Sequence, residues 1–123
     1  MENEYKVIFF EKESGIYPAE DYINSLNDKL SAKVYRILNM IEKNGPELKE
    51  PYSKYLIDGI LEVRARVGTD LARVLYFYHT GKYVIATHGF TKKTKKTPLS
   101  EIEKAKAYRT EYLKREATKN ANT

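Results

Sequence analysis

Hydrophobic positions in the first half of the chain change from a strand pattern to a helical one. Residues 5–10 are rich in β-branched and aromatic side chains and predict a first strand. Pro18 follows, and proline is favoured at the first position of a helix. Apolar residues then recur at three- and four-residue steps through two helices, the second beginning near Asp28. Gly45, followed by a proline, ends that helix, so a helical hairpin is expected after the first strand.

Beyond residue 55 the period becomes two. Residues 60–67 alternate between two sets of side chains, which is typical of a strand with one buried face. Residues 71–78 alternate in the same way, and a further short apolar segment covers 83–90. Tight turns at 68–70 and 80–81 predict that these three strands form an antiparallel meander.

A last helix is expected to start at Thr97 and Pro98. Its apolar stripe consists of Leu99, Ile102, Ala105, Tyr108 and Tyr112. The resulting order, β-α-α-β-β-β-α, predicts an α+β fold. The helical hairpin would cover one face of an antiparallel sheet, and the other face would be free for function. We expect one domain over residues 1–116 and a polar, frayed tail over 117–123.

Composition narrows the function classes. The 123 residues contain no cysteine, which excludes disulfides, thiolate zinc sites and a cysteine nucleophile. Two histidines are too few for a zinc site without carboxylate help, so no metal or cofactor is expected. The sequence contains no membrane-length apolar run, and its first residues do not resemble a signal peptide, so we expect a cytoplasmic protein outside the membrane.

The charge points to a polyanionic partner. The net charge is +5 and the pI is about 9.2. Most lysines lie beside glutamates on predicted helices, but residues 91–96 carry four lysines and no acid. These are Lys92, Lys93, Lys95 and Lys96. Such a cluster more often aids solubility, but its position just after the last strand makes it a candidate for phosphate contact.

Arginines form the second candidate cluster. Arg64 and Arg66 are two residues apart on a strand and therefore share a face. A register that aligns the hydrophobic faces places Arg66 opposite Arg73, and a two-residue turn at 80–81 places Arg73 opposite His88. The predicted row is Arg66, Arg73 and His88, with Arg64 beside it. A one-residue slip would move His88 or an arginine to the other face.

This row suits metal-independent RNA cleavage. Arginine stays charged, and one guanidinium can donate two parallel hydrogen bonds to phosphate oxygens, which stabilises a pentavalent phosphorane. Histidine titrates near neutral pH and can move protons. The hypothesis requires that the guanidinium groups lie together and are not locked into carboxylates beneath the surface; Glu62 is the one acid nearby. The alternative is a solvated strand face with His88 packed at a strand end.

Four segments carry a resemblance to a known family: residues 45–54, 58–64, 73–77 and 88–98. In this order they resemble the phage-derived, HigB-like branch of the RelE/ParE toxin superfamily. The resemblance runs from about Tyr5 to Tyr112.

The resemblance implies a RelE-like fold and a partner antitoxin, usually a HigA-like helix-turn-helix protein that alone would contact operator DNA. It also implies cleavage of mRNA in the A site of the 30S ribosomal subunit, leaving a 2′,3′-cyclic phosphate. Arg64 and Arg66 would contact the message, Arg73 would stabilise the transition state, and Lys92 or Lys93 would supply a further cation. Residues 97–100 depart from the family by lacking a late tyrosine or acid, so His88 is the substitute candidate for proton transfer.

We therefore expect a catalytic set of Arg66, Arg73, His88 and Lys93, with RNA contacts from Arg64, Lys92, Lys95 and Lys96. Two other functions are compatible with such a fold. The first is a ParE-like DNA gyrase inhibitor, although that branch generally lacks the basic cluster. The second is an inactive nucleic-acid-binding domain.

Overall fold

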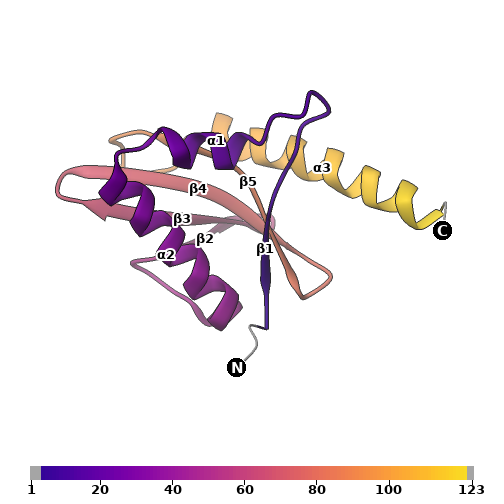
Figure 1. Cartoon of the computed structure of the whole chain (residues 1–123), viewed down its shortest axis with the longest axis horizontal. Helices are drawn as coiled ribbons and strands as arrows, with labels where there is room; N and C mark the ends of the chain where they lie inside the picture. The colour runs from indigo at the N-terminus through magenta and orange to yellow at the C-terminus, as the bar shows by residue number, and fades with distance from the viewer. Residues whose placement is uncertain (1–3, 122–123) are drawn as a thin grey trace.

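The computed structural model describes residues 4–121 and has an α+β fold (Figure 1). The strands are β1 (Lys6–Phe9), β2 (Ser53–Ile57), β3 (Ile60–Val67), β4 (Asp70–His79) and β5 (Tyr83–Thr91). The helices are α1 (Pro18–Ser25), α2 (Asp28–Asn44), a 3-10 turn at Gly45–Glu47, and α3 (Leu99–Ala121). No helix within residues 4–121 combines the length and the apolar character needed to cross a membrane.

The sheet has the strand order β1-β5-β4-β3-β2. Strands β2 to β5 pair antiparallel, and β1 pairs parallel with β5. The α+β class and the meander are therefore confirmed. The expected antiparallel pairing holds for β2 to β5 but not for β1, which lies parallel to β5 at the edge of the sheet. Strand β2 was not predicted, since it has only five residues and its exposed edge position leaves it without clear alternation.

Each face of the sheet has its own core. The helices α1 and α2 bury one face, where Val34 and Ile37 pack against Val63, Val74 and neighbouring residues. The opposite face carries a smaller cluster that includes Leu75, Phe77 and Ala105 of α3. Figure 1 shows the last turns of α3 projecting beyond the sheet. The second face is thus only partly open, contrary to the expectation that it would be free for function.

Local sequence explains the helix ends. Pro18 is the first residue of α1, as predicted. The side chain of Asn27 accepts a hydrogen bond from the amide of Leu30 and caps α2. Gly45 ends α2 with a φ of 55°, a conformation that glycine adopts without steric cost.

The last helix differs from its prediction at both ends. It begins at Leu99, and Leu99 is 70% exposed instead of belonging to the apolar stripe. It continues to Ala121, so residues 117–121 of the expected frayed tail are helical, and 122–123 lie outside the described residues. Two ion pairs, Arg115–Glu111 and Lys119–Glu116, each join residues about one turn apart on this helix and support its last turns.

Candidate functional site

Arginines from β3 and β4 share the face of the sheet that α3 partly covers. Arg64 lies directly opposite Arg73, and Arg66 lies opposite Leu71. The prediction that Arg66 faces Arg73 is therefore wrong by two residues. The chain turns more tightly than expected: Val67 pairs with Asp70, and Gly68 with a φ of 62° permits the short turn between them.

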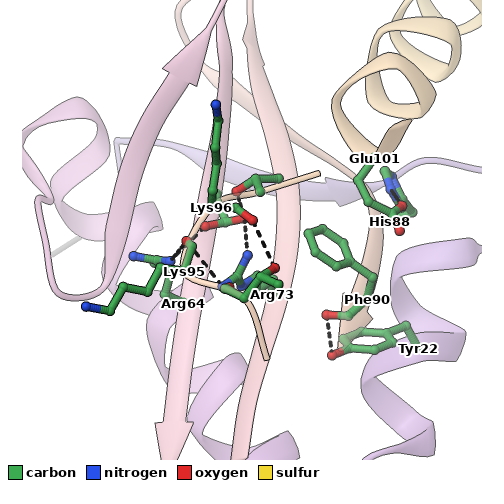
Figure 2. Close-up of polar contacts among 11 residues, drawn as sticks. Tyr22, Arg64, Arg73, His88, Phe90, Lys95, Lys96 and Glu101 are labelled. Carbon is green, nitrogen blue, oxygen red and sulfur yellow. Dashed lines mark hydrogen bonds and ion pairs between the residues drawn. The ribbon is translucent and has the colours of Figure 1, made fainter. Parts of the chain in front are cut away.

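His88 lies on the same face but not in the arginine row. The turn between β4 and β5 pairs His79 with Tyr83, one residue longer than predicted, and the register shifts again between Leu75 and Tyr76. His88 consequently lies opposite Leu75, and Phe90 lies opposite Arg73. Figure 2 shows Phe90 between Arg73 and His88, so the predicted row of Arg66, Arg73 and His88 does not exist.

A buried carboxylate lies among the arginines. Glu62 and Arg73 are both fully buried, and Oε2 of Glu62 is 4.0 Å from Nη1 of Arg73. Oε1 of Glu62 is 3.0 Å from Nε of Arg64, close enough for charge attraction but without the alignment of a hydrogen bond. The hydroxyl of Thr97 donates to Oε2 over 2.6 Å. The arginines share one face of the sheet, as the RNA-cleavage hypothesis requires. That hypothesis also requires arginines that are not paired with buried carboxylates, and Arg73 does not meet this condition.

The segment after β5 covers the guanidinium of Arg73. Nη2 of Arg73 donates to the main-chain oxygen of Thr94 and, over 3.4 Å, to that of Lys95. Nη2 of Arg64 donates to the same oxygen of Lys95 over 2.7 Å (Figure 2). Main-chain oxygens of residues 94 and 95 therefore occupy donor positions of both arginines.

Arg73 retains donor capacity in this closed arrangement. Within residues 4–121, Nε and Nη1 of Arg73 have no hydrogen-bond partner. Its guanidinium carbon is 5.8 Å from the centre of the Phe90 ring, which favours a cation at that point. Burial lowers the pKa of Arg73 and Glu62 opposes the shift, yet a guanidinium stays charged at neutral pH.

His88 is buried with both ring nitrogens engaged. Nε2 lies 3.1 Å from Oε1 of Glu101 at the start of α3, and Nδ1 lies 3.1 Å from the hydroxyl of Thr87. Burial lowers the pKa of His88, while Glu101 acts in the opposite direction. This geometry ties β5 to α3 and offers no nitrogen to a substrate.

The remaining predicted cations are exposed. Side chains of Arg66, Lys92, Lys93, Lys95 and Lys96 make no ion pair or hydrogen bond with any residue from 4 to 121. Lys92 and Lys93 line a small pocket with Arg66, whereas Lys95 and Lys96 line another with Arg64. No group of three His, Cys, Asp or Glu residues in this part of the chain has the geometry to hold a metal ion.

Sequence reasoning noted Glu62 as the nearby acid but did not predict its burial against Arg73, and it missed the other contacts that close the site. Glu62 alternates with Arg64 and so shares its face, a signal that pointed to an internal ion pair. Thr97 was expected to start the last helix, but its hydroxyl contacts Glu62 instead. The contacts made by the main-chain oxygens of residues 94 and 95 could not be predicted, because every residue type carries such an oxygen.

The described site thus combines arginines on one face of the sheet with an exposed lysine segment beside them. Residues 21–110 match the model of the family described as phage derived protein Gp49-like (DUF891). The chain belongs to this family, which is a family of RelE-like toxins.

Solved structures similar to the chain include one of an archaeal RelE–RelB complex from Pyrococcus horikoshii OT3. The two chains are 15% identical, the match covers 78% of this chain and 100% of that chain, and the TM-score is 0.47. No curated protein matches the chain.

Proposed function

We propose that this toxin is a ribosome-dependent mRNA endonuclease that is neutralised by a helix-turn-helix antitoxin. The observation that carries the proposal is the pair Arg64 and Arg73, which together hold the main-chain oxygens of residues 94 and 95. An RNA phosphate presents the same kind of acceptor with a full negative charge, and charged acceptors bind guanidinium groups more strongly than neutral ones.

Binding of message would therefore displace the lysine segment (residues 92–96) from Arg73. The lysine side chains of this segment are exposed and would contact the neighbouring phosphates as it moves. Arg73 would then face the scissile phosphate, with Arg64 and Arg66 along the same face of β3.

The reaction needs no group beyond the RNA and protein side chains. The 2′-oxygen forms a bond to phosphorus, the bond from phosphorus to the 5′-oxygen breaks, and the products carry a 2′,3′-cyclic phosphate and a 5′-hydroxyl. Arg73 would stabilise the extra negative charge at phosphorus. One proton leaves the 2′-hydroxyl and one reaches the 5′-oxygen; His88 remains the candidate for this transfer and must leave Glu101 to act.

A second function is favoured by one observation: Arg73 is fully buried beside Glu62. A domain in which this arrangement never opens would bind RNA through its exposed cations and leave it intact. No comparable observation favours gyrase inhibition.

The test is to induce the protein in bacteria and map the 5′ ends of mRNA on ribosomes. Arg66→Gln is the informative variant because this side chain is exposed and supports no other residue between 4 and 121. Arg36→Gln, an exposed change on α2, is the matched control. The proposal expects new 5′ ends with the wild type and with Arg36→Gln, and at least tenfold fewer with Arg66→Gln. Growth arrest without new 5′ ends would reject the nuclease.

A further inference from the structure

The free edge of β3 borders a cavity that the arginine row does not explain. Strand β2 pairs with β3 only as far as Ser53 opposite Val63, and the amide of Arg64 donates to the main-chain oxygen of Tyr52 just beyond. Past this point no strand within residues 4–121 pairs with β3 on that side. A cavity of about 590 Å³ opens there, within the range of about 300–1,000 Å³ typical of small-molecule sites. Its lining consists of Lys33, Glu50, Pro51, Tyr52, Arg64, Arg66, Gly68 and Leu71.

The lining of this cavity includes three cations, Lys33, Arg64 and Arg66. Nζ of Lys33 donates to the main-chain oxygen of Arg66 over 2.6 Å, which fixes the ammonium of α2 at the edge of β3. Two further N–H groups of this ammonium remain free to donate. The guanidinium of Arg66 makes no hydrogen bond or ion pair within residues 4–121. The pair thus offers two positive charges that form no ion pair with any carboxylate of residues 4–121.

The same lining includes an aromatic ring, that of Tyr52. Tyr52 is 37% exposed, and its main chain is held at both ends, by the amide's bond to Lys49 and by the carbonyl's bond to Arg64. Its hydroxyl has no hydrogen-bond partner in the described part of the chain, so it remains available to a ligand. Pro51 and Leu71 add apolar surface, and Glu50 is the one carboxylate on the lining.

We propose that this cavity binds one nucleotide of single-stranded RNA, with its phosphate at Lys33 and Arg66 and its base on the ring of Tyr52. Recognition of unpaired RNA combines these two contacts, a cation for the backbone and an aromatic face for the base. Glu50 repels phosphate and accepts hydrogen bonds from a base that carries an amino group. The inference deepens the proposed function, since Arg64 lies both at this cavity and opposite Arg73, so the bound nucleotide neighbours the scissile one.

The test measures binding without cleavage. Adenosine 5′-monophosphate and cytidine 5′-monophosphate are titrated into the isotope-labelled full chain, with ribose 5-phosphate as the probe that lacks a base. Amide and side-chain NMR shifts give the affinity and the location. Tyr52→Leu removes the ring, and Tyr55→Leu is the matched control because Tyr55 is exposed on β2 outside the cavity. Lys33→Gln is compared with Lys29→Gln, an exposed change on the same helix.

We expect both nucleotides to shift the resonances of Lys33, Tyr52 and Arg66 and to bind about tenfold more tightly than ribose 5-phosphate. Tyr52→Leu should remove that difference, and Lys33→Gln should weaken all three probes severalfold. Equal affinity for ribose 5-phosphate, or unchanged nucleotide binding in Tyr52→Leu, would overturn the base site. If the protein binds nucleotides but cuts no mRNA, the proposed nuclease activity is rejected and the nucleotide site stands. If it cuts mRNA but binds no nucleotide in this cavity, the nucleotide site is rejected and the nuclease activity stands.

Discussion

The carboxylate of Glu62 lies 4.0 Å from the guanidinium of Arg73, and both side chains are completely buried. A buried charge without its partner costs far more than an exposed one, because it loses water and gains nothing in return. The two residues therefore depend on each other for stability, whatever Arg73 does to RNA. This dependence makes Arg73→Ala a poor test of catalysis, since the fold itself is expected to suffer.

Glu62→Gln should lower the free energy of unfolding by about 3 kcal/mol, because it leaves Arg73 charged and buried without a counter-charge. Urea denaturation at pH 7.5 measures the change. Glu103→Gln is the matched control: Glu103 is exposed and its ion pair with Lys106 is 3.8 Å long, so we expect less than about 0.5 kcal/mol there. Equal stability of the two variants would show that Glu62 does not compensate Arg73.

Acid should destabilise the protein through His88. Burial holds the pKa of His88 below its value of 6.5 in the unfolded chain. The unfolded state therefore binds the proton first as the pH falls below that value, so stability decreases in that window. His88→Gln should reduce the fall in Tm between pH 7.5 and pH 5.5.

His79→Gln is the control for this measurement, as His79 lies at the end of β4 and contacts Tyr112 edge-on. If Tm falls with pH as steeply in His88→Gln as in the wild type, the result would contradict a buried, neutral imidazole at His88. The same variant tests proton transfer, since mRNA cleavage that persists in His88→Gln would remove His88 from the catalytic set.

The lysine segment should contribute salt-dependent RNA affinity. Replacing Lys92 and Lys93 by glutamine removes two exposed charges, which should weaken RNA binding and reduce the slope of log K against log salt by about 1 to 2. Fluorescence anisotropy with a 2′-O-methyl oligonucleotide, which cannot be cleaved, provides the readout. The control is replacement of Lys29 and Lys43, both exposed on α2. An equal loss in both pairs would show attraction by net charge alone.

Among the glycines with a positive φ, we expect Gly45 to tolerate replacement by alanine least. A Cβ atom there would come within 2.2 Å of the Tyr5 ring, in addition to the cost of a φ of 55°. Gly15→Ala is the control, because its φ is 88° but nothing lies within 4 Å. We expect Gly15→Ala to cost about 1 kcal/mol and Gly45→Ala at least twice that in urea denaturation. Similar costs would mean that Tyr5 moves away freely.

The contrast between α2 and the arginine row shows how far sequence reasoning reaches. Helix α2 follows from its own residues, because the apolar positions and the cap at Asn27 are local signals. The position of Arg73 depends on two turns and one register shift, and each of them moves a side chain past a neighbouring strand. The strand meander was therefore predictable, but the residues that face each other across it were not.

Glu62 marks the other limit. Its identity and its face were readable, yet its burial depends on the segment that returns over it through Thr97. Contacts between a side chain and a distant main-chain oxygen, such as that of Arg64 with residue 95, leave no pattern in the sequence. The sequence therefore identified the candidate residues, but it did not predict the contacts of Glu62 and of residues 94 and 95 that cover Arg73.

The parallel pairing of β1 with β5 has a consequence for synthesis. Residues 6–9 are made well before residues 83–86, to which they bond. The amino-terminal strand must wait unpaired while most of the chain is made, and contacts of this sequence separation form slowly. The toxin can thus complete its sheet only after β5 has been synthesised.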